Sequence, residues 1–197
     1  MSNVTQTTIT HYSLLIAHYS LFIGVFMLDR ATLTSRVSAQ FPSVILGDES
    51  GDLVLTVGRS HLLQVAGWLR DDPDLDFTFL TNLCGVDYLG REPRFEVVVH
   101  LTSISNKMRI ALHIGIPEND PTIPSLTRMF PTANFQERET YDMFGIIFSG
   151  HPGLERILMP EDWMGYPQRK DTPLGYEEVA FTHNEDWVYA NKPFAKE

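Results

Sequence analysis

The stretch "RFEVVVHLTSISNKMRIALHIGI", residues 94–116, restricts the possible folds of this chain more than any other segment. Phe95, Val97 and Val99 alternate with Glu96 and Val98, and β-branched residues of this kind favour strands. The polar "SISNK" separates two such runs, so the simplest structure is a β-hairpin. The run of valines suggests that the first strand is buried on both faces near its centre.

Helical periodicity appears on the N-terminal side of this hairpin. Leu33, Val37 and Phe41 recur at helical spacing, which predicts a helix over 30–41 with Asp29 as its N-cap and Pro42 as its stop. "SVILGDESGDLVLTV" then predicts two short strands around a Gly and Asp turn.

"SHLLQVAGWLRDD" predicts a second amphipathic helix, which Ser60 would cap. The apolar face of this helix would contain Leu62, Leu63, Ala66 and Leu69.

Beyond the hairpin, prolines and glycines mark the expected element ends. Thr122 and Pro124 are placed to open a short helix that Pro131 closes. Asn134 can then cap a further helix, with Glu137 completing a relative of the capping box and Gly145 ending the helix in a left-handed conformation.

These elements together predict an α+β fold, with helices packed on a mainly antiparallel sheet and an extended Pro-rich C-terminal segment. We expect the folded domain to span 29–148. Residues 149–197 are rich in Pro, Gly and aromatics without periodicity, and extended chain of this kind needs a partner or the domain surface to lie on.

The N-terminal residues 1–28 are expected to lie outside the fold. Ile9 to Met27 is apolar and long enough to span a bilayer, but it contains the short repeat "HYSLLIA" and "HYSLFIG". A secretory signal would require a basic residue near its start, but no Lys or Arg precedes Arg30. A membrane anchor, an unstructured tail and an over-long reading frame that truly starts at Met27 are the alternatives, and we favour the last.

"ERETYDMFGI", residues 137–146, gathers three acids on the last predicted helix. At 100° per residue, Glu137 and Glu139 point about 200° apart, so they cannot flank one bond as a catalytic pair. Glu139 and Asp142 would share a face, and Arg138 is in range to neutralise Asp142. The acids of the first turn would complement the helix dipole.

Two interpretations of this segment remain open on physical grounds alone. One is a solvated helix turn. The other is a charged interface patch that includes Tyr141, Met143 and Phe144, since aromatics and Arg are enriched at interface centres.

Composition disfavours several other functions. The net charge of −10 and the lack of a basic run longer than Arg169 and Lys170 argue against nucleic-acid binding. The single cysteine, Cys84, falls short of the four thiolates that usually hold an iron–sulfur cluster, and it is expected to be a buried apolar residue. The sequence contains no phosphate-binding glycine loop.

The remaining polar residues form no recognisable constellation. The histidines at 61, 100, 113, 151 and 183 lack metal-ligand spacing. Asp87, Tyr88 and Asp171 could be polar site residues, but nothing in their spacing unites them.

The run from residue 94 to 174 resembles the C subunit, also called the 30 kDa-type subunit, of NADH:quinone oxidoreductase, respiratory complex I. The similarity extends over roughly 30–180. Phe135 departs from the family pattern, which has tryptophan there, and the apolar N-terminal repeat has no counterpart. The signature and expected partner interface comprise Glu137, Arg138, Glu139, Tyr141, Asp142, Phe144, Gly145, His151, Pro152, Arg156, Pro160, Asp162 and Trp163.

The resemblance implies a non-catalytic subunit of the peripheral arm, at the cytoplasmic face of the cell membrane, that binds no cofactor. It implies packing chiefly against the neighbouring D subunit, which helps to build the quinone site. Electrons would pass from NADH through FMN and Fe–S clusters of partner subunits to quinone, coupled to proton translocation. Membrane association would be indirect, through the complex.

The resemblance also suggests how the interface is built. Arg138 and Arg156 would pair with acids, some across the interface, and the tail would wrap a partner. The alternatives are the same scaffold in a membrane-bound hydrogenase or ferredoxin-fed complex, or a stand-alone hydrolase that uses Glu139, Asp142 and His151.

Overall fold

The computed structural model describes residues 28–49, 51–172, 181–184 and 186–187. The apolar repeat at 1–27 and the last part of the tail therefore lie outside the described residues. Within those ranges, no helix is long and apolar enough to cross a membrane.

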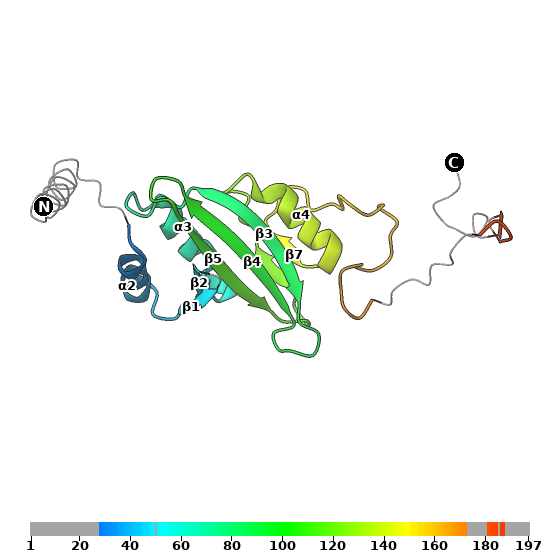
Figure 1. Ribbon diagram of the computed structural model, residues 1–197, viewed down its shortest axis with the longest axis horizontal. Helices are drawn as coiled ribbons and strands as arrows, with labels where there is room; N and C mark the ends of the chain where they lie inside the picture. Colours follow the sequence, from blue (N-terminus) through cyan, green and yellow to red (C-terminus); the bar gives the residue numbers. More distant parts are fainter. Residues whose placement is uncertain (1–27, 50, 173–180, 185, 188–197) are drawn as a thin grey trace, which may run out of the picture.

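A five-stranded sheet forms the centre of the domain (Figure 1), in the order β1-β2-β5-β4-β3. Its strands are β1 (Ile45–Glu49), β2 (Asp52–Thr56), β3 (Phe79–Asp87), β4 (Phe95–Ser103) and β5 (Met108–Ile116). Only β2 and β5 run parallel, and the other three pairings are antiparallel. The predicted hairpin is confirmed as β4 and β5, and the predicted α+β class with a mainly antiparallel sheet is confirmed.

The helices α2 (Arg30–Gln40) and α3 (Leu62–Asp71) pack their apolar residues into a common core with one face of the sheet. Asp29 caps α2 as predicted, because its side chain accepts the Thr32 N–H at 2.8 Å. Leu33 and Val37 are fully buried against that core. Burial of such side chains stabilises each by about 1.5–3 kcal/mol, which fixes α2 to the sheet.

The start of α3 differs from the prediction. A short 3-10 helix, η1 (Arg59–His61), precedes α3, so Ser60 lies inside that turn and does not cap the helix. Leu63, predicted on the buried face, is exposed, and Val65 is buried. The extra turn shifts the entry of the helix, so its buried stripe is Leu62, Val65, Ala66 and Leu69.

Strand β3 has no counterpart among the predicted elements. It pairs with β4 along one side and forms an edge of the sheet, with a bulge between Leu80 and Asn82. Cys84 lies in this strand. It was predicted to be buried in the core, but it is only partly buried.

The helix predicted around Thr122 to Pro131 is wrong. Residues 122–124 form strand β6 (Thr122–Pro124), which pairs in parallel with β7 (Ile147–Ser149). Only turns follow before α4 (Ala133–Phe144). Pairing with a strand more than twenty residues away outweighed the local proline signal.

Helix α4 lies alongside β3 (Figure 1) and carries most of the acidic segment. Its N-cap is Thr132, and no side chain caps it, so the predicted Asn134 cap and capping box are wrong. The first turn contains no acid. Gly145 ends the helix with φ of 74°, as predicted.

Candidate assembly interface around helix α4

Asp142 is the centre of a buried charged cluster between α4 and the residues that follow β7. We call residues 154–172 the strap; within it the structure contains no helix or strand. Asp142 is fully buried, and its Oδ2 accepts the backbone N–H groups of Ile157, Leu158 and Met159 at 3.1, 2.8 and 2.8 Å. Its Oδ1 accepts from Arg156 at 2.5 Å.

The electrostatics of Asp142 follow from these contacts. Burial alone would raise its pKa, but the N–H groups of Met159 and Leu158, with Arg156 and the Ile157 N–H, outweigh burial and lower the pKa below its ordinary value. The carboxylate is thus ionised at neutral pH and holds three consecutive strap residues against the end of α4.

Arg156 extends this cluster further along the strap. Its Nη2 donates to the carbonyls of Trp163 and Gly165 at 3.2 and 3.0 Å. The guanidinium also lies 5.5 Å from the centre of the Tyr166 ring. One arginine therefore folds ten strap residues into a single loop.

The prediction that Arg138 neutralises Asp142 is wrong. Arg138 donates to the carbonyls of Glu155 and Arg156, at 3.1 and 3.2 Å. The neutralisation of Asp142 was inferred from the helical spacing alone, whereas Asp142 points to the strap N–H groups and the half-buried Arg138 bonds to strap carbonyls.

Gly145 allows the strap to return over the end of α4. A Cβ at this position would lie 2.4 Å from Tyr166 and 2.6 Å from Arg169. Arg169 in turn donates to the carbonyl of Phe144 at 2.7 Å. Glycine is needed here both for its left-handed backbone and for this close approach.

A second buried ion pair fixes the far end of the strap. The side chain of Arg94 is 4% exposed and forms a two-bond pair with Asp87, both bonds 3.0 Å long. Arg94 also contacts Asp171 at 2.9 Å, and Asp87 accepts the Lys170 N–H at 2.8 Å. The hydrogen bond from Arg94 holds the pKa of Asp87 below its ordinary value despite burial.

This second cluster unites Asp87 and Asp171, which the sequence offered only as unconnected polar residues. Arg94 was missed as a site residue. The signal was an Asp that ends one strand and an Arg that precedes the next, but β3 was not predicted, so the pair could not be recognised. The Tyr88 side chain does not join the cluster; the Arg91 guanidinium lies 4.7 Å from the centre of its ring.

Glu137 has a different role from the capping group that was predicted. It is fully buried, and its carboxylate accepts from the Ser125 hydroxyl at 2.6 Å and the Leu126 N–H at 2.7 Å. Burial raises its pKa to about 7, against the opposing effect of those two hydrogen bonds. Glu137 thereby joins α4 to the segment that follows β6.

The structure separates Glu139, Asp142 and His151. We predicted that Glu139 and Asp142 share a face of the helix, but Glu139 is exposed whereas Asp142 is buried. His151 contacts the Asn134 carbonyl at 3.2 Å and accepts the Gly153 N–H at 3.0 Å. Asn134 and Asp142 are eight residues apart on α4, about 12 Å along the helix axis. The predicted opposition of Glu137 and Glu139 is confirmed, since one is buried and the other exposed.

The other signature residues fall into two groups by exposure. Tyr141, Phe144 and Trp163 are partly buried, and Tyr141 meets Tyr166 edge to face with ring centres 6.3 Å apart. Phe135, where the family pattern has tryptophan, is exposed, with the Arg138 guanidinium 6.0 Å from its ring. The exposed signature residues besides Glu139 are Pro152, Pro160 and Asp162.

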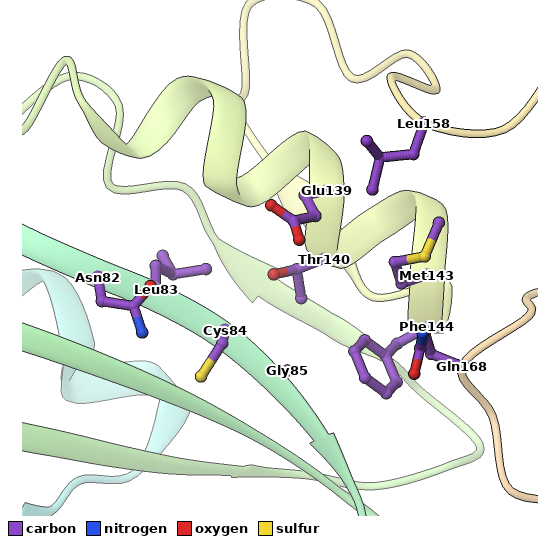
Figure 2. A pocket seen from close by; sticks show the side chains of 10 residues that line it. All are labelled: Asn82, Leu83, Cys84, Gly85, Glu139, Thr140, Met143, Phe144, Leu158 and Gln168. Atoms are coloured by element: carbon purple, nitrogen blue, oxygen red, sulfur yellow. The ribbon is translucent and has the colours of Figure 1, made fainter.

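A groove of about 310 Å³ lies between α4 and the edge of β3 (Figure 2), and we call it the α4–β3 groove. Figure 2 shows the Phe144 ring pointing from α4 toward β3. A Cβ on Gly85 would lie 2.7 Å from that ring, so glycine lets helix and strand approach. The lining is completed by Asn82, Leu83, Cys84, Glu139, Thr140, Met143, Leu158 and Gln168.

The chemistry of this region suits holding chain segments together. Among the described residues, no three His, Cys, Asp or Glu side chains are grouped so that they could hold a metal ion. Burial, with Glu139 and Glu96 nearby, raises the pKa of the Cys84 thiol, so at neutral pH it stays protonated and a weak nucleophile. The buried carboxylates of Asp87, Glu137 and Asp142 each hydrogen-bond to other groups of the chain.

Comparison with known proteins identifies close relatives. The family model described as "Respiratory-chain NADH dehydrogenase, 30 Kd subunit" matches residues 55–178. The C subunit of NADH-quinone oxidoreductase from Herpetosiphon aurantiacus is 81% identical over 171 residues, which are 87% of this chain and 100% of the relative. The protein of the same name from Roseiflexus sp. is 62% identical over 172 residues, covering 86% and 99%.

Two solved structures share the fold. A trypsin-resistant fragment of Nqo5 is 33% identical, with a TM-score of 0.56, and the match covers 61% of this chain and 98% of that one. A chain of an archaeal membrane-bound sulfane sulfur reductase has a TM-score of 0.63 at 20% identity, covering 72% and 84%. The second likeness concerns the fold alone.

Proposed function

This chain belongs to the family of the respiratory-chain NADH dehydrogenase 30 kDa subunit, and from that premise we propose that it is a structural subunit of the peripheral arm of NADH:quinone oxidoreductase. In this proposal it holds no redox group. FMN and Fe–S clusters in partner subunits carry electrons from NADH to quinone, and proton translocation follows elsewhere in the complex. The lone Cys84 and the lack of a nucleotide-binding loop support this assignment.

We further propose that the strap is the contact surface for a partner, chiefly the D subunit, at the cytoplasmic face of the membrane. The observation that carries this proposal is the Asp142 cluster, which turns the backbone N–H groups of residues 157–159 inward and leaves the Ile157 and Leu158 side chains exposed. Leu158 is 60% exposed and Met164 is 92% exposed. Exposed apolar side chains on a fixed scaffold are a common feature of protein contact sites.

The same scaffold in a membrane-bound hydrogenase or a ferredoxin-fed complex is the alternative. The names of the relatives at 81% and 62% identity favour the NADH-quinone enzyme. A stand-alone hydrolase is disfavoured, because Asp142 is held in a buried ion pair and His151 lies near the opposite end of α4.

The test is Arg138→Ala in the native complex. Loss of its two bonds to strap carbonyls should reduce the yield of assembled complex, while turnover per assembled complex stays normal. Arg30→Ala is the matched control, because Arg30 lies in α2, far from α4 (Figure 1), and pairs with exposed Asp48. Unchanged yield with turnover abolished would overturn the proposal in favour of a catalytic role.

A further inference from the structure

The two edges of the sheet differ in how they are protected. Strand β1 is five residues long and ends in exposed Asp48 and Glu49, features that discourage pairing with another chain. Strand β3 is nine residues long, has no charged residue before Asp87 and contains no proline. An edge of this kind is expected to be covered when the protein is in use.

The backbone groups that β3 leaves open can be identified from its pairing. The Tyr88 N–H donates to the Arg94 carbonyl at 2.8 Å, so these residues form a hydrogen-bonded pair. The register is unbroken from Asn82 to Asp87, and the two kinds of pair alternate along antiparallel strands. The N–H and C=O groups of Leu83 and Gly85 therefore point away from β4.

These open groups lie in the α4–β3 groove. Leu83 and Gly85 both line it, and neither backbone hydrogen-bonds to another element within the part of the chain that the structure describes. The Leu80 carbonyl, further along the edge, already accepts from the Thr132 hydroxyl at 3.3 Å. The open backbone groups of Leu83 and Gly85 thus belong to residues that line the groove.

The groove also has a definite chemical character. Met143, Phe144 and Leu158 provide apolar walls. Glu139 stands at its rim (Figure 2), and no cation among the described residues lies within salt-bridge distance of it. An extended peptide that pairs with an edge strand gains affinity from main-chain bonds and specificity from alternate side chains.

We propose that the edge of β3 receives an extended segment of another subunit, which pairs with the backbone of Leu83 and Gly85 and places a Lys or Arg beside Glu139. A second copy of this chain is a poor occupant, because two molecules of net charge −10 would bring their Glu139 side chains together. The strap contributes Leu158 and Gln168 to the groove, so this contact is continuous with the proposed strap interface.

The inference rests on the proposed function for its partner, and hydrogen exchange tests it separately. Exchange is measured at single amides in the free chain and in the assembled complex. The Leu83 and Gly85 amides should exchange about a hundredfold more slowly in the complex. The Cys84 and Val86 amides, which bond to β4, should be protected in both states and serve as internal controls.

Three other outcomes of the exchange experiment would contradict the strand pairing, the proposed function or the kind of partner. Fast exchange at Leu83 and Gly85 in an assembled complex overturns the strand pairing and leaves the proposed function intact. Absence of the chain from the complex overturns the proposed function itself. Protection that appears in the free chain as its concentration rises identifies a second copy as the occupant and overturns the heterologous partner.

A charge reversal tests the chemistry of the occupant. Glu139→Lys should weaken incorporation into the complex about tenfold, because attraction becomes repulsion. Glu49→Lys, which reverses an exposed acid of β1 at the opposite edge of the sheet, should have little effect. Equal effects of the two variants would overturn the placement of a basic residue beside Glu139.

Discussion

Helix α4 buries two carboxyl groups, and their pKa values are shifted in opposite directions. Glu137 and Asp142 are both fully buried, five residues apart. Glu137 has two neutral donors and a pKa raised to about 7, whereas Asp142 has an arginine and three backbone N–H groups and a lowered pKa. Burial raises the pKa of any acid, and the number and charge of the donors decide whether that effect prevails.

The opposite pKa shifts of Glu137 and Asp142 correspond to two different structural roles. Glu137 bonds only within the folded domain, where a protonated carboxyl can still hydrogen-bond. Asp142 holds the strap, and it must be charged to pair with Arg156. Glu137 therefore changes its protonation near neutral pH. The Asp142 carboxylate, which holds the strap, stays ionised until pH falls below the ordinary Asp value of 3.8.

Asp142→Asn should have the largest effect, because it leaves Arg156 without its buried anion. Removal of one partner from a buried pair costs about 3–5 kcal/mol. Chemical denaturation and limited proteolysis should show a lower free energy of unfolding and faster cleavage within 154–172. Asp162→Asn, the same change at an exposed strap residue, is the control and should alter neither quantity. An intact, protease-resistant strap in Asp142→Asn would contradict this role.

Asp87→Asn should have an intermediate effect, about 2 kcal/mol, since Arg94 keeps Glu118 and Asp171 as partners. The Asp171 side chain is 48% exposed, so Asp171→Asn should cost less than about 1 kcal/mol. Thermal unfolding of the two variants under matched conditions measures the difference. If the two costs were equal, the buried Asp87–Arg94 pair would not be the dominant contact at this end of the strap.

Glu137→Gln should have the smallest effect, visible as a change in pH dependence. Between the ordinary pKa of 4.5 and the folded value of about 7, the folded state binds more protons than the unfolded state, so stability falls as pH rises. From pH 6 to 8 this amounts to about 1 kcal/mol. The glutamine variant should lack that loss, because its amide does not titrate.

The measurement for Glu137 is a series of urea denaturations between pH 5 and 8. Glu139→Gln, an exposed acid on the same helix, is the control and should keep the pH dependence of the natural protein. A pH profile that Glu137→Gln leaves unchanged would place the titrating group elsewhere.

Local signals predicted the elements that depend on near neighbours. The Asp29 cap bonds three residues ahead, the β4–β5 hairpin closes over a short turn, and Gly145 ends α4 through its own backbone. Helical geometry likewise separated Glu137 from Glu139. Each of these interactions joins residues adjacent in sequence or on consecutive turns, so the pattern alone contains the information.

Tertiary structure decided the rest of the site. Asp142 bonds to residues 14–17 positions later, and Asp87 bonds to Lys170, 83 positions later. The edge strand β3 has mixed burial, so its sequence carries no clean alternation. The sequence by itself determined the fold class and the family resemblance. Only chain packing decided which acids face inward, because the partner that neutralises a buried charge comes from a segment that periodicity cannot locate.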